Sequence, residues 1–157
     1  MIKIVKGDLL TVKHGIICHS VNCQGKMNSG VAKQIREKYP QVYTDYKKMV
    51  DEYTIEIDLR RELLGKINPV EVGEDLYVVN MFGQLNYGYD GYKYTNETAL
   101  YSCFKQIRKR AEKYGLPVSM PYMVGGYRGG GDWKLIEDYL LNAFDGYEVT
   151  LYKYNEG

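Results

Sequence analysis

Along this chain, apolar residues recur with the spacing of a strand in some segments and with the spacing of a helix in others. This pattern predicts alternating strands and helices. Short apolar or alternating runs, bounded by glycine, proline or charged residues, have the pattern of strands. The run at residues 15–21 is almost wholly apolar, as in a strand buried on both faces. Pro69 places another run at a sheet edge. The predicted strands are residues 2–5, 15–21, 54–59, 66–72, 76–81, 117–121 and 148–154.

Apolar residues at helical spacing predict four helices, at residues 31–39, 42–53, 95–114 and 133–144. Their ends carry residues that commonly start or stop helices. Pro40 ends the first helix, Thr95 is placed to cap the third, and Asp132 is placed to cap the fourth. Gly115 follows the third helix and Gly146 follows the fourth.

This alternation predicts an α/β fold with three α/β/α layers and a central mixed sheet. No repeat, linker or low-complexity tract divides the chain. Residues 1–157 are therefore expected to form a single domain.

Two glycine-bearing segments, residues 19–35 and 119–136, each lead from a predicted strand into a predicted helix. Glycine lets backbone N–H groups approach a ligand, and the helix N-terminus behind it favours negative charge. In open α/β sheets, ligands lie beyond the carboxyl ends of strands. We therefore expect both loops, with the tyrosine-rich loop at residues 82–94, to line one cleft for a phosphate-containing small molecule.

Composition narrows the class of partner. The 157 residues include 21 Lys and Arg against 20 Asp and Glu, a formal net charge of +1. This balance lacks a basic footprint, so strong binding of free nucleic acid is not expected. Three cysteines without a CxxC pair and only two histidines predict no metal site, and no cofactor motif is present.

The same sequence predicts a cellular setting. The N-terminal segment lacks the features of a secretory signal, and no apolar run reaches membrane-spanning length. A cytoplasmic protein with reduced thiols and no membrane contact is expected. No heptad pattern demands an oligomer, so a monomer is expected.

Four segments carry a resemblance to a known family. They are KGDLL at residues 6–10, VNCQGKMNSGVAKQIREKYP at 21–40, NMFGQ at 80–84 with the later YT at 94–95, and SMPYMVGGYRGGGDW at 119–133. Together they resemble the macro domain, whose family ligand is ADP-ribose and its derivatives. The nearest resemblance is to the small bacterial and phage-encoded branch grouped with ADP-ribose 1''-phosphate phosphatases. CHSVNCQG at residues 18–25 is similar to the yeast phosphatase of that class.

The resemblance implies a set of ligand-binding residues. It places Asp8 at the adenine amino group, with Leu9 beside it, and Asn22 at the distal ribose. The phosphate-facing residues that it implies are Gly30, Val31 and Ala32 in the first loop and Gly126, Tyr127, Arg128 and Gly129 in the second. Clustered backbone N–H donors in both loops suit phosphate oxygens independently of the resemblance.

The residues by themselves leave other interpretations open. Asp8 follows a glycine after a strand and has the pattern of a turn residue. The glycine run of the second loop is compatible with a permissive connector, and Arg128 with a solvated surface side chain. Trp133, in the first turn of a helix, is typical of a core residue.

Two departures from related enzymes bear on the chemistry. The ADP-ribose glycohydrolase branch of the family uses a lysine after the third buried strand and an aspartate in the second loop. Here that strand runs into Met81, Phe82 and Gly83, and the second loop has no aspartate before Asp132. A lysine–aspartate mechanism is therefore not expected.

The catalytic candidates are His19, which titrates in a useful range, and Asn22, which can orient water or ribose hydroxyls. His19 aligns with the histidine of the yeast-type motif, although a histidine within an apolar strand is also typical of a core residue. Cys23 is a possible nucleophile or a small buried residue. Asp90 could reach the distal phosphate if the tyrosine-rich loop closes as a lid.

Three functions remain on the sequence alone. The first is removal of the phosphate from ADP-ribose 1''-phosphate. The second is hydrolysis of ADP-ribose from a modified protein or nucleic acid, for which an ADP-ribosylated macromolecule is the partner. The third is non-catalytic binding of ADP-ribose.

Overall fold

The structure is a computed structural model that describes residues 1–88, 92–126 and 129–154. Its secondary structure alternates strands and helices along the chain, as the hydrophobic pattern predicts. The elements are β1 (Ile2–Lys6), η1 (Leu9–Thr11), β2 (Gly15–Asn22), α1 (Gly30–Lys38), α2 (Pro40–Glu52), η2 (Arg60–Leu63), β3 (Ile67–Gly73), β4 (Leu76–Gln84), α3 (Glu97–Tyr114), β5 (Val118–Pro121), α4 (Trp133–Ala143) and β6 (Val149–Lys153).

The strands form one mixed sheet in the order β1-β6-β5-β2-β4-β3. All neighbouring strands are parallel except β3, which runs antiparallel to β4 at the edge. Pro69 lies in this edge strand, where the absence of an N–H group costs no hydrogen bond to a second neighbour. The expected mixed sheet and the edge position of residues 66–72 are confirmed.

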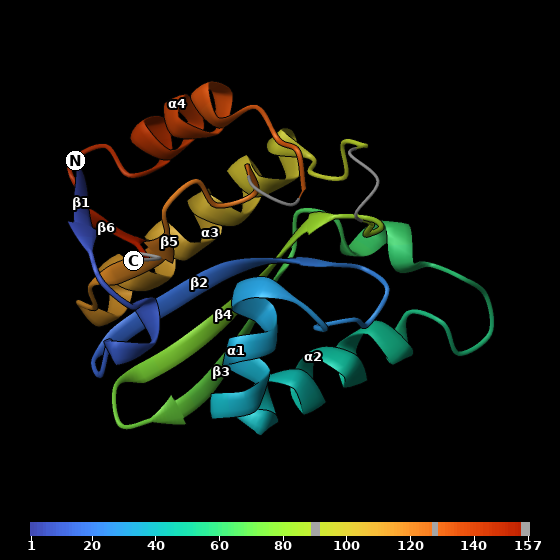
Figure 1. Cartoon of the computed structure of the whole chain (residues 1–157). Coiled ribbons are helices and arrows are strands. Elements are labelled where there is room, and N and C mark those ends of the chain that lie inside the picture. Colours follow the sequence, from blue (N-terminus) through green and yellow to red (C-terminus); the bar gives the residue numbers. More distant parts are fainter. Residues whose placement is uncertain (89–91, 127–128, 155–157) are drawn as a thin grey trace.

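Helices cover both faces of the sheet and create two apolar layers (Figure 1). Alternate residues of the buried strand β2 point to opposite layers. Cys18 packs with the layer under α3 and α4, whereas Ile17 packs with the layer under α1 and α2. Because β2 lies in the middle of the sheet, its carboxyl end opens between the two layers.

The start of α3 differs from the sequence prediction. Asn96, not Thr95, caps the helix, since the Asn96 Oδ1 atom accepts a hydrogen bond from Ala99 N at 2.9 Å. The Thr95 hydroxyl instead donates to Gly125 O at 2.6 Å. Both residue types are good caps, and the tertiary contact of Thr95 decides between them.

The predicted roles of Gly115 and Asp132 at helix ends are confirmed, whereas Gly146 lies beyond the C-cap of α4, which is Phe144. Gly115 follows α3 in the left-handed region, with φ 64°. Asp132 caps α4 and accepts a hydrogen bond from Leu135 N at 3.3 Å.

The strand expected at residues 54–59 is absent, and these residues form turns and bends before η2. Ile55 and Ile57 are 78% and 65% exposed, so their alternation with polar residues marks no buried face. A hydrogen bond from Leu59 N to Tyr53 O closes the segment on itself. The strand predicted at residues 76–81 is longer than expected, because β4 continues to Gln84.

No helix in the described part of the chain is both long enough and apolar enough to cross a membrane.

Candidate functional site

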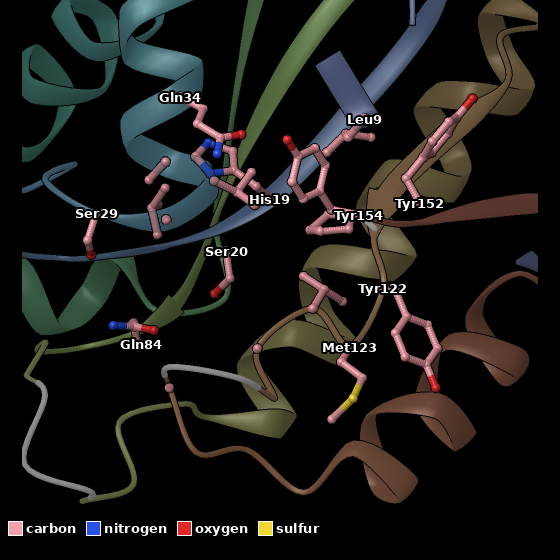
Figure 2. Close-up of a pocket in the computed structure, with 18 of the residues that line it drawn as sticks. Leu9, His19, Ser20, Ser29, Gln34, Gln84, Tyr122, Met123, Tyr152 and Tyr154 are labelled. Atoms are coloured by element: carbon pink, nitrogen blue, oxygen red, sulfur yellow. The ribbon is translucent and has the colours of Figure 1, made fainter. Parts of the chain in front are cut away.

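A cleft of about 900 Å³ opens at the carboxyl ends of β2, β4 and β5. Three loops distant in sequence contribute to its lining: the start of α1, the end of β4 with residues 87–88, and the turn after β5 (Figure 2). The convergence of three loops on one cleft is thus confirmed. The volume lies within the range of small-molecule sites.

Asp8 and Leu9 line one part of this cleft. Asp8 caps η1, and its Oδ1 atom accepts a hydrogen bond from Leu10 N at 2.9 Å. No described residue donates a hydrogen bond to its other carboxylate oxygen. Asp8 is therefore both the turn residue and a cleft acceptor, and the two interpretations of the sequence are compatible.

Asn22 lines the cleft, but its side chain mainly shapes the first loop. Its Oδ1 atom accepts hydrogen bonds from Gln24 N at 2.9 Å and from Tyr46 Oη at 2.9 Å. Its Nδ2 atom donates to Lys26 O at 2.9 Å. Because the loop occupies the carboxamide oxygen, we expect Asn22 to act through the shape of the loop.

The N-terminus of α1 faces the cleft through Gly30, Val31 and Ala32. The intrahelical ladder begins with Lys33 N, which donates to Ser29 O at 3.2 Å. The N–H groups of the three preceding residues have no acceptor within the helix, as at every helix start. Together with the helix dipole they favour an anion here.

The second loop is held against the segment before α3. Tyr94 N and Thr95 N donate to Gly129 O at 2.7 and 2.9 Å. Gly125 and Gly129 line the cleft, whereas Gly126 lies outside its lining. Tyr127 and Arg128, the other two binding residues expected in this loop, lie outside the described residues, as does Asp90.

Packing explains part of the glycine run. A Cβ atom on Gly129 would clash with Thr95 Oγ1, and one on Gly131 would lie 2.7 Å from Gly125 O. Gly125 has a φ of 76°, in the region that side chains rarely adopt. These glycines are needed for the close approach of two backbones, whether or not a ligand is bound.

Glu97 fixes the far end of the same loop. Its carboxylate accepts a hydrogen bond from Asp132 N at 2.9 Å and forms an ion pair with Lys93 at 2.6 Å. Burial alone would raise the pKa of Glu97, but these two partners lower it below its usual value. The starts of α3 and α4 are thereby joined beside the cleft.

His19 forms part of the cleft wall and is 2% exposed. Its Nε2 atom lies 2.5 Å from Asn80 Oδ1, while Nδ1 is buried without a partner among the described residues. Burial lowers the pKa of His19 to about 4, against a smaller opposing effect of the hydrogen bond to Asn80. The imidazole is therefore neutral near pH 7, and it is a weak base.

Cys23 does not have the properties of a nucleophile. It is fully buried, and burial raises the pKa of its thiol to about 12 despite the opposing charge of Arg60. The thiol stays protonated at neutral pH, so the small buried role is the one that the structure supports. Trp133 packs against the core and lies edge-on to Tyr122, at 5.6 Å between ring centroids.

Several residues of the cleft were missed by the sequence analysis. Tyr122 follows β5 directly, Tyr152 and Tyr154 are alternate residues at the end of β6, and Gln84 ends β4 (Figure 2). Each is at the carboxyl end of a parallel strand, which is the signal that could have identified them.

The cleft-lining lysines among the described residues are Lys26 and Lys153. Neither follows β4, whose exit carries Gln84, so the structure supplies no described lysine at the place used by the glycohydrolase branch. No group of three or more metal-ligating side chains gathers within residues 1–88, 92–126 and 129–154.

This chain is similar to curated proteins, although no family profile matches it. A DNA ADP-ribosyl glycohydrolase of Mycobacterium tuberculosis is 27% identical over 147 residues, which cover 92% of this chain and 39% of that protein. An ADP-ribose 1''-phosphate phosphatase of Saccharomyces cerevisiae is 33% identical over 82 residues, which cover 50% of this chain and 43% of that protein. The chain thus spans about two fifths of the length of these relatives.

Several solved structures have a fold similar to that of this chain over nearly its whole length. A Bacteroides thetaiotaomicron protein of unknown function has a TM-score of 0.84 at 25% identity, over 98% of both chains. The macrodomain of Mycobacterium tuberculosis DarG has a TM-score of 0.78 at 23% identity, over 97% of both chains. Thermosipho africanus DarTG in complex with ADP-ribose has a TM-score of 0.75 at 17% identity, over 97% of this chain and 41% of that one.

The chain therefore has the macro-domain fold, as its sequence resemblance implied.

Proposed function

We propose that this macro domain binds ADP-ribose and hydrolyses the phosphate of ADP-ribose 1''-phosphate. One observation carries the proposal: a single cleft joins Asp8, the N-terminus of α1 and the glycine loop after β5. An elongated diphosphate ligand with adenine at one end would contact all three. The cleft offers a carboxylate for the adenine amino group and backbone N–H donors for the phosphates.

The comparisons support both parts of this proposal. A structural neighbour over 97% of this chain is described in complex with ADP-ribose. The yeast relative is an ADP-ribose 1''-phosphate phosphatase, and it matches half of this chain.

In the proposed reaction, a water oxygen attacks phosphorus and the bond between phosphorus and the sugar oxygen breaks. The proton lost by water is returned to the sugar oxygen, and ADP-ribose and inorganic phosphate leave. Phosphoryl transfer depends mainly on positioning and on stabilisation of charge. We assign charge stabilisation to the N–H groups of the two loops and orientation to His19, because a pKa of about 4 makes His19 a poor base. Asn22 contributes by holding the first loop in shape.

The second candidate function is hydrolysis of ADP-ribose from a modified macromolecule. It is favoured by the mycobacterial glycohydrolase, which matches 92% of this chain. A lysine-dependent version of this reaction is not favoured, because β4 ends at Gln84 and not at a lysine. The third candidate is a non-catalytic ADP-ribose-binding module.

A panel of substrates separates these functions. Calorimetry with ADP-ribose tests binding, and phosphate release from ADP-ribose 1''-phosphate tests the phosphatase. Release of ADP-ribose from modified protein and modified DNA tests the hydrolase. Binding with phosphate release supports the primary proposal, release from a macromolecule supports the second, and binding alone supports the third. Absence of ADP-ribose binding would contradict all three.

The oligomeric state and the cellular location are also proposals. We propose that residues 1–157 form one monomeric domain in the cytoplasm, without membrane contact or a metal cofactor. Light scattering of the purified chain tests the monomer, since a mass near twice 18.1 kDa would contradict it.

A further inference from the structure

A chain of polar side chains crosses the apolar layer beneath α1 and α2. It starts at His19 on β2, continues through Asn80 on β4 and Asn68 on β3, and ends at Asp45 on α2. Asn80 Nδ2 donates to Asn68 Oδ1 at 2.9 Å, and Asn68 Nδ2 donates to Asp45 Oδ1 at 2.8 Å. With the contact of His19 and Asn80 at 2.5 Å, the hydrogen bonds are continuous from the cleft to the outer helix.

Sheet register produces this alignment. His19 is paired with Asn80, and Asn80 is paired with Asn68, so the three side chains stand side by side on one face. They are 2%, 0% and 7% exposed, whereas Asp45 is exposed. Burying polar groups among apolar side chains is costly unless each finds a partner. The four hydrogen-bonded side chains are partners for one another, in the order that the sheet register sets.

Asp45 sets the direction of every hydrogen bond. A carboxylate only accepts, so Asn68 must present its amide nitrogen to Asp45 and its oxygen to Asn80. Asn80 must then donate its nitrogen to Asn68 and present its oxygen to His19. The oxygen of Asn80 only accepts, and His19 must therefore carry its proton on Nε2.

The protonation state of the other ring nitrogen of His19, Nδ1, follows from this. A neutral imidazole has one N–H donor and one lone pair, so a proton on Nε2 leaves the lone pair on Nδ1. Nδ1 is buried without a partner among the described residues, in a ring that belongs to the wall of the cleft (Figure 2). A buried acceptor without a donor is unfavourable, and a bound O–H group would satisfy it.

We propose that Asp45, Asn68 and Asn80 are positioning residues that hold His19 as the Nε2–H tautomer, with Nδ1 as the acceptor for an O–H group in the occupied cleft. That group is a sugar hydroxyl of the ligand or the attacking water. This inference rests on the proposed function for the identity of the ligand, but the tautomer is a property of the unliganded protein.

The test begins with ¹⁵N NMR of the histidine ring in the full chain without ligand. Long-range ¹H–¹⁵N correlations distinguish the Nε2–H tautomer from the Nδ1–H tautomer. We expect pure Nε2–H for His19, with the exposed His14 as the internal reference. An Nδ1–H tautomer in the wild type overturns the proposal.

Asp45→Asn is the diagnostic variant, because an amide can donate as well as accept. It therefore no longer sets the direction of the hydrogen bonds that lead to His19. The expected result is a mixture of His19 tautomers. Asp51→Asn is the matched control, since it makes the same change on α2 and removes only the exposed pair of Asp51 with Lys47. An unchanged tautomer in a folded Asp45→Asn protein overturns the role of Asp45.

Ligand measurements identify the O–H group. If it is a sugar hydroxyl, Asp45→Asn should weaken ADP-ribose binding by the factor by which it reduces the Nε2–H population, about twofold for an equal mixture of tautomers. If it is water, the dissociation constant should stay the same and kcat for phosphate release should fall by a similar factor. No change in either quantity overturns the acceptor role of Nδ1. Failure of the wild type to bind ADP-ribose instead contradicts the proposed function, and the tautomer result stands apart from it.

Discussion

His19 makes the stability of the protein depend on pH. Its folded-state pKa is lowered from 6.5 to about 4, so the unfolded chain takes up the proton first as the pH falls. Stability from this residue is complete above pH 6.5 and is lost between 6.5 and about 4. The full loss corresponds to roughly 3 kcal/mol, at 1.36 kcal/mol per pKa unit.

The first prediction follows from this linkage. His19→Gln should remove most of the decrease in unfolding free energy between pH 6.5 and 4, because glutamine does not titrate. Urea denaturation at a series of pH values measures it. His14→Gln, at an exposed histidine, is the control. A pH dependence in His19→Gln equal to that of the wild type would refute the lowered pKa.

The second prediction concerns Asp8. Asp8→Asn keeps an oxygen to cap η1 but presents an amide donor to the adenine amino group. It should weaken ADP-ribose binding by about tenfold, which is about 1.4 kcal/mol, with little change in thermal stability. Asp8→Ala should weaken binding by at least as much and also destabilise the turn. Calorimetry and thermal melts separate the two effects, and unchanged dissociation constants in both variants would remove Asp8 from the adenine site.

At the scale of elements, the second glycine loop depends on its contact with the segment before α3. Thr95 donates its hydroxyl to Gly125 O and its backbone N–H to Gly129 O. Gly129 has no room for a side chain against that hydroxyl. Gly125 and Gly129 are therefore held in place before any ligand binds, which reduces the entropy lost on binding.

The third prediction tests this contact by a double-mutant cycle. Gly129→Ala should lower the free energy of unfolding by roughly 1–3 kcal/mol, because the new Cβ clashes with Thr95 Oγ1. Thr95→Ala should reduce the further cost of Gly129→Ala, because the clashing atom is gone. Urea denaturation of the four proteins gives the coupling. Additive costs would show that the two residues do not interact, and Gly126→Ala, where the nearest atom lies at 3.2 Å, is the milder control.

At the scale of the whole molecule, one sheet separates two apolar layers and belongs to both. Strand β2 contributes Ile16 and Cys18 to one layer and Ile17 and Val21 to the other. Loss of either layer would expose one face of the central strands. The two layers are therefore expected to unfold together.

The fourth prediction is a single cooperative transition. Trp133, the one tryptophan of the chain, packs against the layer under α3 and α4, so its fluorescence reports that layer. Far-ultraviolet circular dichroism reports all helices. The two urea transitions should have the same midpoint and slope if residues 1–157 form one domain. Separate midpoints would show two independent units.

Local patterns predicted much of the fold and the general place of the site. The apolar run of β2, the end of α3 at Gly115 and the glycine loops at strand ends depend on near neighbours in the chain. The exception at residues 54–59 shows the limit of such patterns. Alternation there predicts a strand, but a strand also requires a partner, and the described sheet ends at β3 without pairing to residues 54–59.

The sequence by itself determined which chemical groups the site can use, because residue types at strand ends set the available donors and acceptors. Only the tertiary structure decided what those groups do. In the structure, the Asn22 side chain hydrogen-bonds within its own loop, Asn96 caps α3, and a series of hydrogen bonds links His19 to Asp45. The physical reason is that a hydrogen bond across three strands depends on register and on the packing of α2, which no local pattern in the chain contains.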